Sequence, residues 1–168
     1  MSDLYVSWTD YHSDIERLAK TIHESGWAFD QIICIARGGL RIGDVLSRIW
    51  DAPLAIISTS SYVEHAGTVR GEIAISTHLA MTTPNLGRRV LLVDDLVDSG
   101  VTLDVVLRDL AKRYPDISEI RTAVLWWKAC SKFKPDYFVK YLADNPWIHQ
   151  PFERYDQVKP AEVAASVR

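Results

Sequence analysis

The residues with the clearest chemical potential lie together in the segment Val90–Leu103, whose sequence is VLLVDDLVDSGVTL. An apolar run brings two adjacent acids, Asp94 and Asp95, to its carboxyl end. Neighbouring carboxylates suit the vicinal hydroxyls of a sugar or a divalent cation, because both need anionic oxygen atoms. The next stretch, Asp98–Thr102 (DSGVT), has the composition of a turn that enters a helix, where backbone N–H groups, a glycine and hydroxyls can hold a phosphate. The segment therefore predicts a phosphate site beside a sugar or metal site.

This segment has two other interpretations. It could be a strand that ends in solvated acids, with Asp98 or Ser99 capping the following helix. The combination of an apolar run, paired acids and Asp-Ser-Gly-x-Thr disfavours that interpretation. It could also be the acidic strand end of a nucleoside triphosphatase. The chain has no G-x-x-x-x-G-K-[S/T] motif, so this second interpretation fails.

Size and composition narrow the class of protein. The 168 residues are 48% hydrophobic and 24% charged, as in globular chains, and we expect a single domain over residues 1–168. The net charge of −3 argues against bulk electrostatic binding to nucleic acid or an anionic membrane. No apolar stretch approaches the roughly 20 residues that a membrane span needs. The two cysteines form no Cys-x-x-Cys pair, so we expect neither a disulfide scaffold nor a zinc site, and we expect a cytoplasmic protein.

Apolar runs and helical periodicity predict the elements that position the segment. Gln31–Ala36 is a continuous apolar run and Val90–Val93 is the most apolar strand candidate. Further strands are predicted at Pro53–Ser60, Ile120–Trp127 and Tyr137–Leu142. Apolar residues recur at helical spacing in Ile15–Ile22, Ile42–Ile49 and Leu103–Leu110. Ser13 and Glu16 have capping-box spacing at the start of the first helix, which should end near Gly26. Leu4–Trp8 has the composition of an edge strand.

Strands that alternate with helices predict an α/β fold, with a mainly parallel twisted sheet flanked by helices. In such sheets ligands bind beyond the carboxyl ends of the strands. Arg37-Gly38-Gly39, the paired acids and the polar stretch Tyr62–Thr77 all follow predicted strands. We therefore expect one site built from several loops, with Tyr62–Thr77 as a flexible loop or hairpin.

Val90–Leu103 resembles the motif by which type I phosphoribosyltransferases bind 5-phosphoribosyl-1-pyrophosphate (PRPP). From about Ile32 to Glu153 the chain is similar, in order and spacing, to the bacterial xanthine–guanine phosphoribosyltransferases. The other matching segments are the pyrophosphate loop Ala36–Leu40 (ARGGL), the flexible-loop start Ser60-Ser61-Tyr62, Lys128 after a strand, and the hood segment Trp147–Glu153 (WIHQPFE).

The resemblance implies a role for each matching residue. Asp94 and Asp95 would hold the ribose hydroxyls of PRPP and its Mg²⁺, with Asp95 as the metal ligand, and Asp98 would accept the N7 proton of a purine as the catalytic base. The implied 5′-phosphate site is Ser99, Gly100, Val101 and Thr102. The implied pyrophosphate site is Arg37, Gly38, Gly39, Ser61, Tyr62 and Arg70, in a loop where the family often has a non-proline cis peptide. The implied purine site is Lys128, Trp147, Ile148 and Glu153, with Trp147 stacking on the base and Lys128 donating to its 6-oxo group.

The resemblance also implies an arrangement and an activity. The core would span about residues 28–143, with a lid loop and a base-covering hood made of the N-terminal segment and residues 144–158. The implied reaction, part of purine salvage, transfers the 5-phosphoribosyl group of PRPP to a 6-oxopurine (guanine, xanthine or hypoxanthine) and releases pyrophosphate. Mg²⁺ would be the cofactor, and the chain would form a homo-oligomer (dimer or tetramer) without a nucleic-acid partner.

The chain departs from the family pattern in three places. Val101 stands where the relatives have glycine, His149 replaces a glutamate and Glu153 an aspartate. The two hood positions lie near the 2-position of the base, so the choice among the 6-oxopurines stays open. The tail Arg154–Arg168 does not resemble the family tail, and its composition suits a short helix or a disordered segment.

Two alternative functions remain. A PRPP-sensing regulatory protein on the same fold is disfavoured by the acidic charge balance and by the presence of Lys128 and the hood, which a sensor does not need. A phosphoribosyltransferase for adenine or a pyrimidine would not be expected to carry the Trp-Ile hood sequence.

Overall fold

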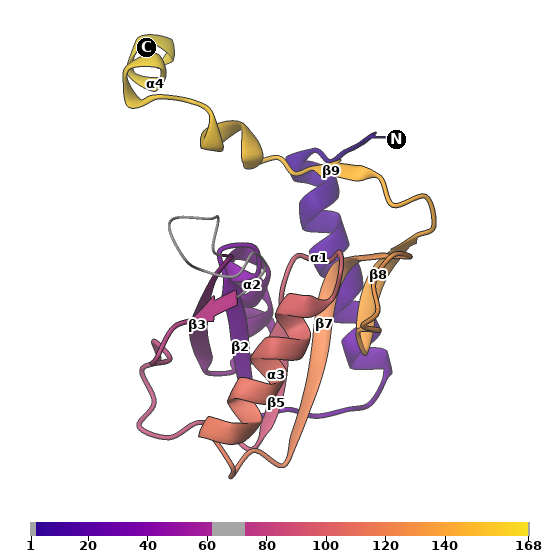
Figure 1. The fold of residues 1–168 in the computed structure, drawn as a ribbon, viewed down its shortest axis with the longest axis vertical. Helices are drawn as coiled ribbons and strands as arrows, with labels where there is room; N and C mark the ends of the chain where they lie inside the picture. Colours follow the sequence, from indigo (N-terminus) through magenta and orange to yellow (C-terminus); the bar gives the residue numbers. More distant parts are fainter. Residues whose placement is uncertain (1–2, 62–72, 168) are drawn as a thin grey trace, which may run out of the picture.

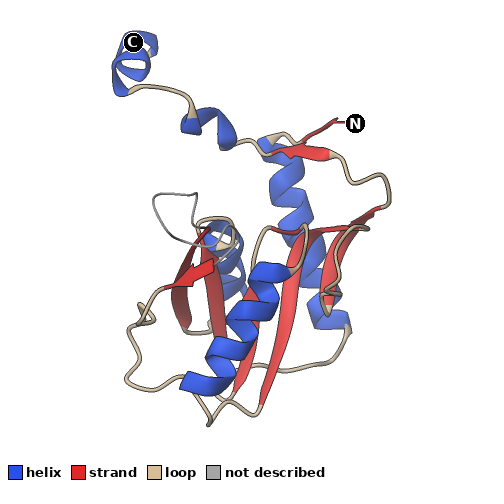
Figure 2. Cartoon of the chain, viewed as in Figure 1, coloured by secondary structure: helices blue, strands red, loops and turns tan. Residues whose placement is uncertain are grey.

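The computed structural model describes residues 3–61 and 73–167, and its centre is a mostly parallel sheet (Figures 1 and 2). The strands of this sheet are β2 (Gln31–Ala36), β3 (Leu54–Ser61), β4 (Ile73–Ile75), β5 (Arg89–Val93), β6 (Leu96–Val97), β7 (Glu119–Lys128) and β8 (Tyr137–Leu142). Their order is β4-β3-β2-β5-β7, and both β6 and β8 pair with β7. β4 runs antiparallel to β3, whereas the other ladders are parallel.

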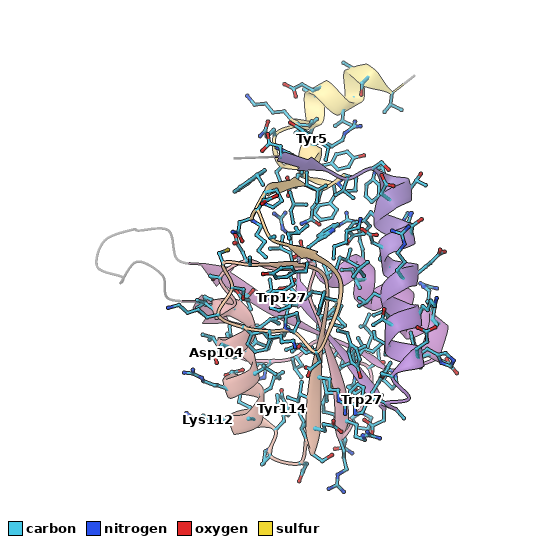
Figure 3. All side chains as sticks on the ribbon, turned by 90° about the vertical axis from the view of Figure 1, so that its right-hand side faces the viewer. Tyr5, Trp27, Asp104, Lys112, Tyr114 and Trp127 are labelled. Atoms are coloured by element: carbon cyan, nitrogen blue, oxygen red, sulfur yellow. The ribbon has the colours of Figure 1, made fainter. Side chains whose placement is uncertain are left out.

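Helices cover both faces of the sheet. They are α1 (Trp8–Glu24), α2 (Leu40–Trp50) and α3 (Val101–Arg113), followed by the 3₁₀ turn η1 (Glu153–Asp156) and α4 (Pro160–Ser166). Successive side chains of a strand point to opposite faces. Ile32 and Cys34 of β2 therefore pack in the core cluster that contains α1 and α2 residues, whereas Ile33 and Ile35 pack in the cluster that contains α3 residues. Figure 3 shows α1 and α3 on opposite sides of the sheet.

A second, two-stranded sheet joins the two ends of the chain. β1 (Asp3–Tyr5) pairs in parallel with β9 (Trp147–His149), so that Leu4 lies opposite Ile148. This small sheet lies above the carboxyl ends of the central strands in Figure 1. It combines the two segments that were expected to form the hood.

Helix α1 connects this hood sheet to the core. Its Asp14 side chain is fully buried and accepts hydrogen bonds from Arg17 at 2.8 Å and from Lys140 of β8 at 2.7 Å. A buried carboxylate is costly unless it is paired in this way. The two cations therefore stabilise the packing of α1 against the edge of the sheet.

The prediction for the start of the first helix is wrong. α1 begins at Trp8, because Ser7 caps it by accepting a hydrogen bond from the Asp10 N–H at 3.1 Å. Ser13 and Glu16 consequently lie inside the helix, where their spacing has no capping function, and the strand expected at Leu4–Trp8 ends at Tyr5. The helix ends at Glu24, just before Gly26 (φ 68°), as predicted.

The remaining strand and helix predictions are confirmed within one to three residues at each end. Residues 62–72 of the predicted polar loop lie outside the described residues, and Ile73–Ile75 returns along β3 as β4. The tail forms η1 and the short, exposed helix α4, which projects from the body in Figure 1. Nowhere in the described ranges does a helix combine the length and apolarity that crossing a membrane requires.

Candidate functional site

The predicted site residues lie at the carboxyl ends of three neighbouring strands. β2 ends just before Arg37, β5 just before Asp94, and β7 at Lys128. β5 pairs with both β2 and β7, and all three strands are parallel. The loops that follow them therefore meet at one edge of the sheet, as expected for an α/β ligand site.

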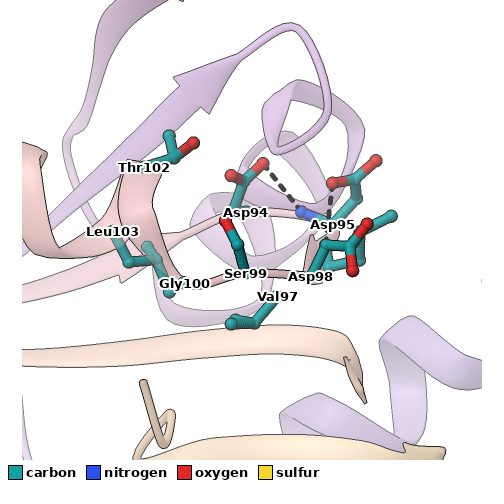
Figure 4. A pocket seen from close by; sticks show the side chains of 9 residues that line it. Asp94, Asp95, Val97, Asp98, Ser99, Gly100, Thr102 and Leu103 are labelled. Atoms are coloured by element: carbon teal, nitrogen blue, oxygen red, sulfur yellow. Dashed lines mark hydrogen bonds between the residues drawn. The ribbon is translucent and has the colours of Figure 1, made fainter. Parts of the chain in front are cut away.

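Asp94 and Asp95 occupy a short break between β5 and β6, which both pair with β7. The Asp94 N–H donates to the Ala123 carbonyl at 3.1 Å, and the Asp95 carbonyl accepts from the Leu125 N–H at 2.9 Å. β7 thus holds the backbone of both acids. Their side chains line a cavity of about 210 Å³ (Figure 4). The other lining residues are Leu96, Val97, Asp98, Ser99, Gly100, Thr102 and Leu103.

Both carboxylates are partly withdrawn from water. Burial raises the pKa of Asp94 well above its usual value, and the adjacent Asp95 carboxylate adds to this effect. Burial also raises the pKa of Asp95, although hydrogen bonds from Gln150 and the Leu96 N–H oppose the rise. A divalent cation would relieve the repulsion between the two acids. The pair fits Mg²⁺, which binds proteins through one or two carboxylates and completes its shell with substrate phosphates and water.

The loop after β2 packs directly against Asp95. A Cβ atom on Gly38 would lie 2.6 Å from both Cγ and Oδ1 of Asp95, so any larger residue at this position would displace the Asp95 side chain. The Ala36–Arg37 peptide bond is cis, as the family resemblance implies. The Gly39 N–H donates to the Ile35 carbonyl at 2.8 Å. Gly39 therefore allows close backbone packing, and its N–H is already hydrogen-bonded within the protein.

The turn before α3 has the features of a phosphate site. Gly100 precedes the first residue of α3 and has φ 84°, a left-handed conformation that favours glycine. The free N–H groups at this helix N-terminus adjoin the cavity that Ser99 and Thr102 line. The Val101 side chain is exposed. The phosphate site expected in this turn stays a prediction.

Lys128 and Asp98 form an ion pair at the end of β7. The Lys128 Nζ lies 3.3 Å from Asp98 Oδ2 and 6.0 Å from the centre of the Trp147 ring. The Lys128 side chain is only 8% exposed, whereas Trp147 is 60% exposed. The structure thus brings together a nearly buried cation, a carboxylate and an accessible aromatic face, three of the groups expected around a purine.

Asp95 also borders a second cavity, of about 450 Å³. This cavity is lined by Arg37, Gly38, Leu40, Arg41, Asp95, Gln150, Phe152, Glu153, Tyr155 and Asp156. Glu153 thus lies on the side of the pyrophosphate loop, and burial raises its pKa. The Arg37 side chain is largely exposed and pairs with Asp156 at 3.3 Å.

Some predicted residues are placed differently or are not placed. The Ile148 side chain is 4% exposed within the core, so only its backbone can face a base. Tyr62, Arg70 and the side chain of Ser61 lie outside the described residues, and their predicted contacts with pyrophosphate stay predictions.

Comparison with known proteins decides the family. Residues 7–157 match the phosphoribosyl transferase domain family. The chain belongs to this family, and it is an enzyme of the pentosyltransferase class. The phosphoribosyltransferase shares 32% identity over 149 residues with a xanthine-guanine phosphoribosyltransferase of Gluconobacter oxydans (strain 621H), a match that covers 88% of this chain and 83% of the relative.

Solved structures of two similar proteins agree with this assignment. A purine phosphoribosyltransferase from Pyrococcus horikoshii superposes with a TM-score of 0.73 at 32% identity, covering 90% of this chain and 94% of the other. A Helicobacter pylori xanthine-guanine-hypoxanthine phosphoribosyltransferase superposes with a TM-score of 0.75 at 26% identity, covering 92% of this chain and 95% of the other. The expected family fold is confirmed.

Two residues of the phosphoribosyltransferase site were missed at the sequence level. The Gln150 side chain donates to Asp95 Oδ2 at 2.5 Å, across 55 residues of chain. The Cys130 thiol lies 3.3 Å from Asp98 Oδ1. Gln150 belongs to the hood segment, so the sequence placed it near the site. No sequence pattern, however, pairs it with Asp95.

The Gly38→Ala substitution tests the packing of the pyrophosphate loop on Asp95. The added methyl group overlaps a side chain that can swing away, so we expect a folded protein whose phosphoribosyl transfer is slower by about 10- to 100-fold, since misplacement of about 1 Å can cost that much. Gly39→Ala is the matched comparison. Its Cβ would lie 2.4 Å from the Val93 carbonyl oxygen of the neighbouring strand, so it should also lower the melting temperature. Unchanged activity of Gly38→Ala would contradict this account.

The Asp94→Asn substitution tests the cost of ionising Asp94, which arises first from its burial and then from the adjacent Asp95 carboxylate. Because the pKa of Asp94 is raised in the folded protein, its ionisation costs stability, and that cost grows as pH rises from the unfolded pKa to the folded one. Asparagine keeps the Oδ1 atom that accepts from the Asp95 N–H at 2.9 Å. We expect the variant to have a higher melting temperature than the wild-type protein without Mg²⁺ at pH 8, by about 2–4 °C for each kcal/mol of ionisation cost removed, a smaller gain at pH 5, and lower activity. A lower melting temperature at pH 8 would contradict a destabilising charge on Asp94.

Proposed function

We propose that this chain transfers the 5-phosphoribosyl group of PRPP to a 6-oxopurine and releases pyrophosphate, with Mg²⁺ as cofactor. The observation that carries the proposal is the nearly buried Lys128 beside Asp98. An ammonium group only donates hydrogen bonds and a carboxylate only accepts them. The pair therefore matches two adjacent positions on one edge of a 6-oxopurine, the oxo group and a protonated N7. The 6-amino group of adenine would instead face a cation.

The two cavities that meet at Asp95 suit the ends of PRPP. The turn before α3 would bind the 5′-phosphate in the smaller cavity. The loop that contains Arg37 and Gly38 would bind pyrophosphate in the larger one. The ribose would then lie between them, with its hydroxyls donating to Asp94 and Asp95.

The proposed mechanism assigns each group one task. Breaking the bond between C1 and pyrophosphate places positive charge on the sugar and negative charge on the leaving group. Bound Mg²⁺ would supply positive charge beside the pyrophosphate, held by Asp95. The Gly38 N–H and the Arg37 guanidinium would stabilise the same charge. Asp98 would accept the N7 proton as N9 attacks, and Trp147 would stack on the base.

The identity of the base is part of the proposal. The G. oxydans relative is named for xanthine and guanine, and the H. pylori neighbour also for hypoxanthine. In the hood of this chain His149 stacks on Tyr5, with ring centres 4.3 Å apart. We propose guanine, xanthine or hypoxanthine as acceptor. A single domain over residues 1–168 and a cytoplasmic location, expected from the length and the cysteines, likewise stay proposals, as does the dimer or tetramer that the family resemblance implies.

The direct test incubates the protein with PRPP and Mg²⁺ in parallel with adenine, guanine, hypoxanthine and xanthine, and measures pyrophosphate release. We expect release with at least one 6-oxopurine and little with adenine. The Asp98→Ala variant should lower kcat by about 100-fold or more, the usual contribution of a general base. A preference for adenine would overturn the role of Lys128, and an unchanged kcat would overturn that of Asp98.

The same assay separates the alternatives. If PRPP binds but no base releases pyrophosphate, the PRPP-sensing regulator on the same fold gains support. Turnover with adenine alone, or only with a pyrimidine added to the same panel, would favour a transferase for another base.

A further inference from the structure

The Gln150 side chain spans the gap between the hood and the paired acids. Gln150 directly follows β9, and its side-chain Nε2 lies 2.5 Å from Oδ2 of Asp95, at the end of the central sheet. The residue is 6% exposed. A carboxylate cannot donate, so the nitrogen of the amide must be the atom that faces Asp95. The contact is therefore a buried hydrogen bond from a neutral donor to an anion.

This hydrogen bond completes the support of the Asp95 carboxylate. Its other oxygen, Oδ1, accepts from the Leu96 N–H at 2.7 Å. Gly38 packs against the carboxyl group on the side of the pyrophosphate loop. Without Gln150 the described residues would leave the carboxylate a donor on Oδ1 alone, and it could rotate about its side-chain bonds.

Gln150 is itself held in place by the hood. The carbonyl of the preceding residue, His149, accepts from the Val6 N–H at 3.0 Å. On the other side Phe152 packs edge-on against Tyr11, with ring centres 5.8 Å apart, and lies under the Arg41 guanidinium at 4.4 Å. The backbone on both sides of Gln150 is thus anchored, so its side chain presents the amide to Asp95 from a fixed position.

We infer that Gln150 is a positioning residue, which holds the Asp95 carboxylate in the orientation that binds the PRPP ribose and its metal and so links the hood to the PRPP site. The inference rests on the proposed function in one respect, that Asp95 binds PRPP. A neutral amide suits this task because it orients the carboxylate without neutralising it. A lysine would form an ion pair and compete with the metal, and a glutamate would repel Asp95.

The test compares three variants with the wild-type protein at pH 8. Gln150→Met keeps a similar shape but removes the donor, Gln150→Glu keeps the shape and adds a charge, and Gln157→Met makes the same change at an exposed glutamine of the same segment. The measurements are the Kd of PRPP with Mg²⁺ by calorimetry, the KM values of PRPP and of the base, kcat, and the melting temperature.

We expect Gln150→Met to weaken PRPP binding by roughly 10- to 100-fold, the range for a lost hydrogen bond to a charged group. The KM of the base should change by less than about threefold, which is smaller than the loss expected for one hydrogen bond to it. Gln150→Glu should bind PRPP more weakly than Gln150→Met, although the glutamate side chain is closer in shape to glutamine. Gln157→Met should match the wild-type protein.

Three results would overturn the inference. They are an unchanged PRPP Kd in Gln150→Met, a rise in the KM of the base as large as that for PRPP, and better PRPP binding by Gln150→Glu than by Gln150→Met. The last two would indicate that Gln150 only shapes the hood. Failure of the proposed function is distinguishable, because the wild-type protein would then bind PRPP without releasing pyrophosphate, and the order of the PRPP Kd values would still test Gln150.

Discussion

Two neighbouring carboxylates held against the end of β7 are the constraint on which the rest of the site depends. β5 stops at Val93 and β6 starts at Leu96, so Asp94 and Asp95 fill the break with their backbone still bonded to β7. Side chains in a break are free of the pleat that would send one acid to each face of the sheet. The cost is electrostatic, because burial raises the pKa of both acids and the Asp95 carboxylate raises that of Asp94 further. Such an arrangement is favourable once hydroxyls or a cation bind.

The surrounding structure accommodates this pair from three directions. Gly38 leaves space for Asp95 on one side, and the turn at Gly100 opens a cavity on the other. The hood contacts the pair through Gln150, which follows β9, and β9 is held by its pairing with β1. The buried Asp14, bonded to Lys140 of β8, ties the helix that follows β1 to the sheet edge. The hood is therefore coupled to the core by polar contacts as well as by apolar packing.

The sequence was informative where the physical signal is local. Strand-like runs predicted β2 and β8 to the residue, and the Asp-Asp and Asp-Ser-Gly-x-Thr pattern located the cavity. A capping pattern alone did not locate the start of α1, because Ser7 and not the predicted Ser13 caps the helix. Non-local features could not be predicted from such patterns. β1 and β9 have three residues each, too few for a periodic pattern, and pair residues from opposite ends of the chain. Gln150 acquires its role only through that pairing.

The most direct measurement of the central claim is a crystal structure of this phosphoribosyltransferase with PRPP and Mg²⁺. The account predicts ribose hydroxyls within hydrogen-bonding distance of Asp94 and Asp95, the 5′-phosphate on the backbone N–H groups at the start of α3, and pyrophosphate beside Gly38. It also predicts that Mg²⁺ lies between Asp95 and the pyrophosphate. PRPP bound away from the break between β5 and β6, or bound there with the two acids turned away from the ribose, would contradict it.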